Sequence, residues 1–116
     1  MGQLMRELAE RGNAILVGRG GSRILRDVPR AFHVRLVAPM SVRVRRVMEY
    51  RWVQEGIAKK LIADSDSRRS NYCESCLGMD WSSPLEYDVT VNNGRLGLTA
   101  VEAVGLAAER HWSHAE

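Results

Sequence analysis

The sequence predicts an α/β protein with a mostly parallel sheet of three strands. Three short β-rich segments alternate with segments of helical periodicity, and such alternation forms βα crossovers that make neighbouring strands parallel. The length of 116 residues, with 45% hydrophobic and 27% charged residues, is typical of one globular domain, residues 1–116. We therefore expect a single core between the sheet and its flanking helices.

The N-terminal part of the chain contains the first predicted strand between two short helices. Apolar residues at helical spacing predict a helix over residues 3–11, which Gly12-Asn13 ends as a C-cap would. Ala14–Val17 is a continuous apolar run between glycine-containing turns, a form typical of a strand covered on both faces. Ser22 is then expected to cap a short helical turn that extends through Leu25.

The middle of the chain is predicted to form a strand followed by two helices. Residues 32–38 are rich in β-formers. From residue 42 to residue 53, apolar residues recur every three or four positions while arginines fall on another face, so this helix carries an arginine stripe. Residues 57–77 are polar and predicted to be helical, with one clear apolar stripe, and residues 78–86 are predicted to be a loop.

The C-terminal part is predicted to contain the third strand and a last helix. Residues 87–91 form the strand, residues 92–94 turn the chain, and Thr99 caps a helix that continues to about Arg110. Ligands of parallel α/β sheets bind at the carboxyl ends of the strands. The segments that follow the three predicted strands, and in which we expect the site, are residues 18–21, 39–46 and 92–94.

Basic residues are distributed unevenly along the chain. Residues 19–69 carry 13 Lys or Arg against 5 Asp or Glu, whereas residues 70–116 carry 2 against 7. Fifteen of the 17 basic residues are arginine, whose planar guanidinium pairs with phosphate oxygens through two hydrogen bonds. Phosphate is therefore the first ligand to consider, and the alternative is that the arginines only decorate solvated helix faces.

The segment Gly18-Arg19-Gly20-Gly21 is a candidate phosphate site. It follows a predicted strand and opens a helix, where free amide groups and the helix dipole attract an anion. Arg19 would add a two-point contact, although a tight turn also needs glycine for purely conformational reasons. The sequence contains no Gly-x-x-x-x-Gly-Lys-Ser/Thr, so this chain cannot assemble a complete cradle for a nucleoside triphosphate.

A second candidate lies in the polar helix, where Asp66, Arg69 and Tyr72 recur every three residues with Arg68 beside them. This spacing places them roughly along one side of the helix. A mobile lid that brings arginine to a phosphoryl group needs such a composition, with much charge and few apolar anchors. The alternative is a solvated helix face whose Asp-Arg pair contributes little to stability.

Other features of the sequence predict no metal site and no membrane association. Cys73 and Cys76 form a lone Cys-x-x-Cys without two further ligands nearby, so we expect ordinary thiols, with a redox pair as the alternative. We expect Trp81 and Tyr87 to anchor a loop on the core, with a platform that stacks a base as the alternative. No apolar run approaches the roughly 20 residues that cross a bilayer, and no signal region opens the chain, so we expect a cytoplasmic protein.

Five segments, read together, resemble the cytidylate-kinase-like family of nucleoside-monophosphate kinases. They follow the family's order and are Asn13–Gly21, Val34–Pro39, Val42–Arg46, Asp66-x-x-Arg69-x-x-Tyr72 and Tyr87–Asn92. The resemblance implies a P-loop-kinase-type parallel sheet with a helical lid at residues 54–80. It also implies phosphoryl transfer from ATP, with Mg²⁺, to a nucleoside monophosphate of the CMP or dCMP type.

The resemblance implies three groups of site residues. The acceptor phosphate is held by Arg19, Gly18, Gly20 and Gly21. The catalytic lid residues are Asp66 and Arg69, of which Arg69 closes on the transferring phosphates. Further phosphate-binding candidates are Arg43, Arg46 and Arg68. Arginines can perform this role because catalysis in this class is mostly positioning and charge neutralisation.

The chain departs from the family pattern at its start. Family members begin with a strand, a glycine loop ending in Lys-Ser/Thr and a helix, and the resemblance begins after these. We therefore expect a truncated, C-terminal portion of the domain that assembles no ATP or Mg²⁺ site alone and has no standalone kinase activity. The absent strand lies in the middle of the family's sheet, so the remaining strand edges must close on one another or pair with another chain, such as a second copy.

Two other functions remain open from the sequence. The chain could be a non-catalytic, arginine-rich module that binds phosphate or nucleic acid, although the acids of residues 70–116 argue against a nucleic-acid partner. It could also be an interaction protein that recruits a partner through an open sheet edge.

Overall fold

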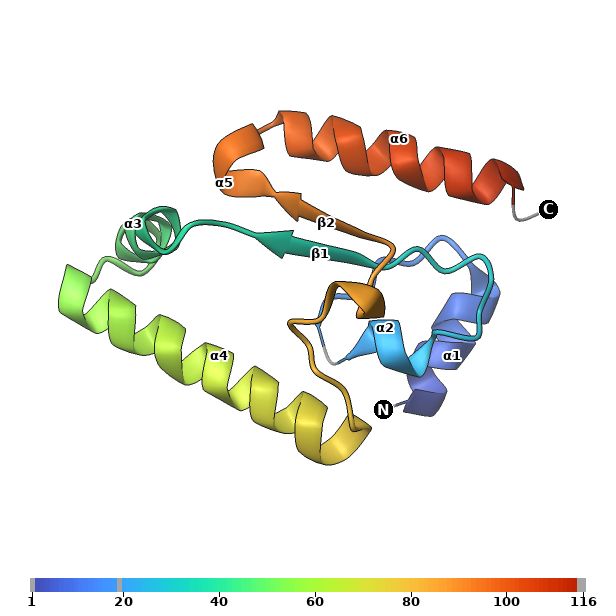
Figure 1. The fold of residues 1–116 in the computed structure, drawn as a ribbon, viewed down its shortest axis with the longest axis horizontal. Helices are drawn as coiled ribbons and strands as arrows, with labels where there is room; N and C mark the ends of the chain where they lie inside the picture. Colours follow the sequence, from blue (N-terminus) through green and yellow to red (C-terminus); the bar gives the residue numbers. More distant parts are fainter. Residues whose placement is uncertain (1, 19, 115–116) are drawn as a thin grey trace.

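The computed structural model describes residues 2–18 and 20–114 and confirms the α/β class (Figure 1). In chain order the elements are α1 (Gly2–Arg11), α2 (Gly21–Ile24), β1 (Val34–Val37), α3 (Met40–Arg51), α4 (Glu55–Leu77), the 3₁₀ helix η1 (Pro84–Glu86), β2 (Val89–Asn92), α5 (Asn93–Leu96) and α6 (Thr99–His114). Both helices predicted in the middle of the chain are present, with boundaries that differ from the prediction by two residues at most.

The sheet consists of β1 and β2, which run parallel in a register that pairs Val34 with Val89 and Val37 with Asn92. The pairing begins at His33, whose backbone N–H donates to the Asp88 carboxylate at 2.7 Å. The crossover between the strands contains α3 and α4, as expected for a parallel pair. In Figure 1, α6 runs alongside β2, α3 lies beyond the carboxyl end of β1, and α4 runs below the sheet on the β1 side.

The strand predicted at Ala14–Val17 is absent, so the described chain has a sheet of two strands where we expected three. These residues have irregular backbone, and the side chains of Ile15 and Val17 are 93% and 87% exposed. A strand is stable only when its backbone groups pair with a neighbour. β2 is the strand that pairs with β1, and nothing in residues 2–18 and 20–114 pairs with Ala14–Val17. The expectation that the open edges close on one another is therefore wrong.

Two other local predictions are wrong in detail. Ser22 does not cap α2, because Gly20 occupies the N-cap position and no side chain bonds to the helix start. The turn predicted at residues 92–94 is the beginning of α5. The Asn92 side-chain oxygen accepts hydrogen bonds from the backbone N–H groups of Gly94 and Arg95 at 3.1 and 3.0 Å, so this asparagine is a helix cap.

The best-packed part of the core lies between α3 and α4. Val44, Ala58 and Ile62 are buried there, and Val47, Met48 and Val53 pack against them. Elsewhere the core is thin, and the Cα radius of gyration is 15.6 Å, compared with about 13 Å for a compact domain of this length. Within the described part of the chain, no helix combines the length and apolar character needed to span a membrane.

Candidate functional site

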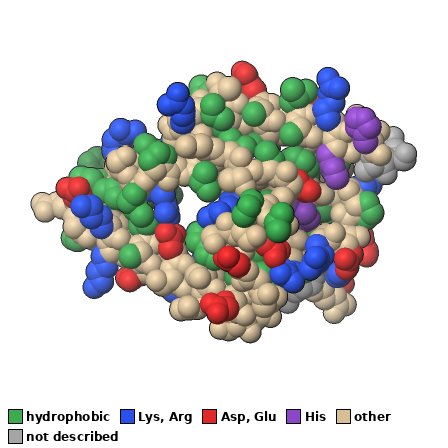
Figure 2. Space-filling model, in the orientation of Figure 1, with side chains coloured by type: hydrophobic (Ala, Val, Ile, Leu, Met, Phe, Trp, Pro, Cys, Tyr) green, Lys and Arg blue, Asp and Glu red, His purple; other side chains and the backbone are tan. Residues whose placement is uncertain are grey.

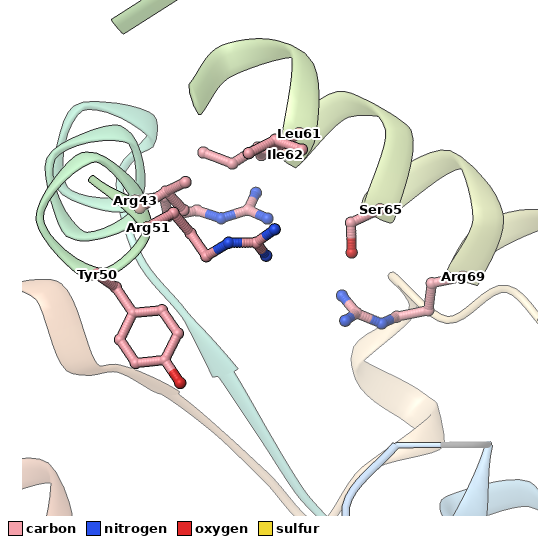
Figure 3. Close-up of a pocket in the computed structure, with 8 residues that line it drawn as sticks. Arg43, Tyr50, Arg51, Leu61, Ile62, Ser65 and Arg69 are labelled. Atoms are coloured by element: carbon pink, nitrogen blue, oxygen red, sulfur yellow. The ribbon is translucent and has the colours of Figure 1, made fainter. Parts of the chain in front are cut away.

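The candidate site lies between α3 and α4, whose side chains surround a cavity of about 260 Å³. Figure 3 shows the guanidinium groups of Arg43 and Arg51, from α3, and of Arg69, from α4, pointing into the space between the two helices. The remaining lining residues are Val47, Tyr50, Leu61, Ile62 and Ser65. In the space-filling view the molecule is hollowed beside α3 and α4, with basic side chains at the edge of the hollow (Figure 2).

Helical spacing explains why these side chains meet. In α3, Arg51 follows Arg43 by eight residues, and in α4, Arg69 follows Leu61 by eight residues, so each pair lies on one face of its helix. The buried contact between Val44 and Ile62 sets the two helices against each other beside this cavity. The amphipathic pattern that packs the helices thus also gathers their arginines.

Asp66 joins the two helices by pairing with Arg43. Two nitrogens of Arg43 donate to the two carboxylate oxygens of Asp66 at 2.9 and 2.8 Å, and Arg69 approaches the same carboxylate at 3.7 Å. The hydrogen bonds with Asp66 raise the pKa of Arg43. Asp66 and Arg69, both predicted as lid residues, therefore share one charge cluster with Arg43, a predicted phosphate-binding candidate.

Trp81 connects this cluster to the sheet. The guanidinium carbon of Arg69 lies 5.1 Å from the centre of the Trp81 ring, and that of Arg35, from β1, lies 4.8 Å from it. The Tyr87 hydroxyl donates to the Trp81 carbonyl at 2.6 Å, and burial raises the pKa of Tyr87. Trp81 and Tyr87 hold the loop against the sheet and α4, which fits the loop-anchoring alternative.

The glycine loop lies at the far end of α4 from the helix pair's packed core. Arg19 lies outside the described residues. Gly18 and Gly20 have φ of +74° and +67°, a backbone conformation that glycine adopts without strain. A Cβ at Gly20 would also meet the end of the Leu77 side chain, from α4. Conformation and packing thus account for Gly20, and phosphate binding by residues 18–21 stays a prediction.

Arg46 and Arg68 lie apart from the cavity lining. Arg46 donates to the side-chain and backbone oxygens of Asn93, both at 3.1 Å, and thereby connects α3 to α5. Gly94 packs closely against Pro39 in the same region. The segments that follow β1 and β2 therefore do meet, as the parallel sheet predicts. Arg68 is exposed on α4, and its contacts with the described residues indicate no role for it.

The two cysteines of α4 have different surroundings. Cys73 is buried and Cys76 is exposed, and both are free thiols. Burial raises the pKa of Cys73. Across residues 2–18 and 20–114, no group of three or more His, Cys, Asp or Glu side chains is placed to hold a metal ion.

Sequence reasoning did not single out Arg51, Ser65 or Arg35 as site residues. The signal for Arg51 was present, because it follows Arg43 at a spacing that keeps both on one helix face. Ser65 follows Leu61 by one helical turn and could have been placed in the same way. Arg35 contacts Trp81 across 46 residues of chain, and no local pattern indicates such a contact.

Fold and cavity together define an α/β protein whose helices present several guanidinium groups to a common space, an arrangement suited to an anion. The model of the cytidylate kinase-like family matches residues 2–95, and the chain belongs to this family. A uronate isomerase of Corynebacterium glutamicum is 27% identical over 97 residues, which cover 84% of this chain and 18% of that protein.

A solved structure shows the same fold. The crystal structure of an uncharacterized protein from Eubacterium ventriosum matches with a TM-score of 0.83 at 22% sequence identity, over 97% of this chain and 63% of that chain. The chain therefore spans less than two thirds of the length of both proteins.

Proposed function

We propose that this chain is a portion of a P-loop-kinase-type domain that transfers a phosphoryl group to a nucleoside monophosphate of the CMP or dCMP type. The observation that carries the proposal is that Arg43 and Arg69, from two helices, converge on one carboxylate, Asp66. Two guanidinium groups that both approach one carboxylate can also contact the oxygens of a single phosphoryl group. Membership of the cytidylate kinase-like family supports the same reaction class.

In this proposal α4, within the predicted lid at residues 54–80, carries Arg69 to the transferring phosphate, and Asp66 positions both arginines. Arg19, with Gly18, Gly20 and Gly21, holds the acceptor phosphate. ATP and Mg²⁺ are the cofactors that the family implies, and we assign them to no residue of this chain. The sequence has no glycine loop ending in Lys-Ser/Thr, so we propose that the 116-residue chain alone binds the acceptor without turnover.

The test is calorimetric titration of CMP into the 116-residue protein and its Arg19→Ala and Arg69→Ala variants. We expect Arg19→Ala to weaken CMP binding about tenfold, because it removes a charge-assisted contact to the acceptor phosphate. Arg69→Ala should weaken CMP binding less, because Arg69 closes on the transferring phosphate, which CMP alone does not supply. Arg95→Ala is the control, since Arg95 lies on α5 and outside the cavity lining, and it should change binding less than about twofold. CMP binding that no variant changes would contradict the assignment.

Two further readouts separate this function from the alternatives. With ATP, Mg²⁺ and CMP together, we expect no ADP to form. Affinity for any polynucleotide that falls steeply with salt would instead favour the nucleic-acid module.

A second proposal concerns assembly. Ile15 and Val17 are highly exposed, and β1 has one edge that no described strand covers. Exposed apolar side chains and an unpaired strand edge each favour pairing with another chain. We propose that a second copy of this chain uses these edges to form a homo-oligomer, and the Discussion gives the measurement.

A further inference from the structure

The cavity between α3 and α4 holds more positive charge than its surroundings neutralise. Arg43, Arg51 and Arg69 line it, and Asp66 is the acid in the described part of the chain that pairs with two of them. Arg51 forms no hydrogen bond or ion pair with another described residue. Like charges gathered in one cavity repel each other, and an anion between them removes that cost.

We propose that this cavity binds a phosphate monoester dianion, with Arg51 as the docking residue, and that phosphate oxygens replace the Asp66 carboxylate on Arg43. The inference rests on the proposed function for the class of ligand. It adds a residue, Arg51, and a displacement step that the proposed function does not contain.

The geometry of the Arg43–Asp66 pair favours phosphate as the replacing group. The two oxygens of the Asp66 carboxylate accept hydrogen bonds from the Arg43 guanidinium group at 2.9 and 2.8 Å. A phosphate group presents oxygens to the same planar fork in the same two-point manner. The hydroxyl groups of Tyr50 and Ser65 also line the cavity and can donate to a further oxygen.

The exposure of the pair makes exchange feasible. The side chains of Arg43 and Asp66 are 33% and 27% exposed, so water screens their attraction. A dianion that also contacts Arg51 gains a partner that Asp66 does not reach. Displacement therefore exchanges one ion pair for contacts with more than one guanidinium.

The remaining lining explains why a phosphate ester fits better than a bare inorganic ion. Part of the cavity wall is apolar and consists of Val47, Leu61 and Ile62. The ring of Tyr50 also lines the cavity. The volume of about 260 Å³ lies just below the range of about 300–1,000 Å³ for larger ligands. The cavity therefore suits a phosphate with a modest organic group attached.

The test compares CMP and inorganic phosphate as calorimetric titrants of the 116-residue protein at low salt. Arg51→Gln should weaken the binding of both about tenfold, because the docking charge is lost. Arg45→Gln is the matched control: Arg45 lies on α3 but not in this cavity lining, and its loss should change affinity less than about twofold. Asp66→Asn should strengthen phosphate binding about threefold or more, because it frees Arg43.

A measurement on the unmodified protein tests the site even if a variant fails to fold. Addition of inorganic phosphate should shift the backbone amide NMR signals of Arg51, Ser65 and Arg69 and leave that of Arg45 in place. Equal losses from Arg51→Gln and Arg45→Gln, or no shifts around Arg51, would overturn the site. Weaker phosphate binding by a folded Asp66→Asn variant would overturn the displacement step.

The two proposals fail in distinguishable ways. Binding that depends on Arg51 but does not distinguish CMP from inorganic phosphate supports an anion site in the cavity, and it contradicts both the preference for an ester and the nucleotide function. CMP binding that depends on Arg19 but not on Arg51 overturns the cavity site and leaves the nucleotide function standing.

Discussion

Arg43 holds both carboxylate oxygens of Asp66, at 2.9 and 2.8 Å, and this contact ties α3 to α4 beside the buried Val44 and Ile62. The two residues are 23 positions apart, so the pair fixes tertiary structure rather than one helix. It also places a guanidinium group in the lining of a cavity that two further arginines line. Stability and the proposed phosphate binding therefore involve the same contact.

Removal of this contact should destabilise the helix pair. We expect Arg43→Ala to lower the free energy of unfolding by about 1–2 kcal/mol, because a two-point charged hydrogen bond is lost from a partly exposed site. Arg45→Ala, in the same helix, should change it by less than about 0.5 kcal/mol. Urea denaturation followed by circular dichroism gives both values. Equal effects of the two substitutions would show that the Arg43–Asp66 pair does not stabilise the fold.

Gly94 should resist substitution because of what faces it. A Cβ at this position would lie 2.8 Å from Pro39 Cδ and 3.1 Å from Ala38 Cβ. The proline ring cannot rotate away, so Gly94→Ala should destabilise the protein by about 1–3 kcal/mol.

Gly105, in α6, is the matched control for this substitution. A Cβ there has no neighbour within 4 Å, and Gly105→Ala should stabilise the helix by about 0.5–1 kcal/mol. Thermal unfolding of the two variants compares them directly, and a Gly94→Ala variant as stable as the parent would mean that α5 does not pack against Pro39.

The sequence predicts local structure here better than pairing between distant segments. The helix that ends at Arg11 follows from its apolar spacing and from Gly12, which has a φ of +77° in the structure. The meeting of Arg46 with Asn93 follows from the parallel sheet. Ala14–Val17 has the composition of a strand, but a strand depends on a neighbour, and composition says nothing about whether one is available.

The same distinction holds for the candidate site. Asp66 and Arg69 are three residues apart in one helix, and their proximity can be read from the sequence. The partnership of Asp66 with Arg43 requires that α4 fold back on α3, which depends on the buried contact at Ala58 and Ile62. The placement of Arg35 against Trp81 depends on the path of a loop, which local patterns do not determine.

The thiols of Cys73 and Cys76 should react at different rates. Cys76 is exposed, whereas Cys73 is buried and burial raises its pKa, so less of it is thiolate at any pH. With a chromogenic disulfide reagent near pH 8, we expect one fast thiol and a second at least about tenfold slower. Cys76→Ser should abolish the fast phase. Two equally fast thiols would mean that the C-terminal turns of α4 are open in solution.

The raised pKa of Cys73 also predicts a pH dependence of stability. A thiol whose folded pKa exceeds its unfolded value contributes stability that is complete below the unfolded pKa, at about 8.5, and is lost as pH rises through the folded pKa. Urea midpoints should therefore fall above about pH 8.5 in the parent and less in Cys73→Ala. An identical slope in both proteins would contradict this origin.

Ile15 and Val17 should matter for association and little for folding. Their side chains are 93% and 87% exposed, so the double substitution Ile15→Thr and Val17→Thr removes almost no buried area and should change the free energy of unfolding by less than about 0.5 kcal/mol. If a second copy pairs at this edge, sedimentation velocity should show an oligomer that grows with concentration in the parent and disappears in the variant.

Leu85 provides the control for general stickiness, because it is 94% exposed but lies in η1 and outside the strands. Leu85→Thr should leave the oligomer intact. Equal loss of association in both variants would attribute it to exposed apolar surface in general. A parent that stays monomeric at every concentration would refute the homo-oligomer. Loss of association in the Ile15 and Val17 variant alone would mean that this β-prone segment takes part in the contact, because Leu85 is apolar and equally exposed but lies outside it.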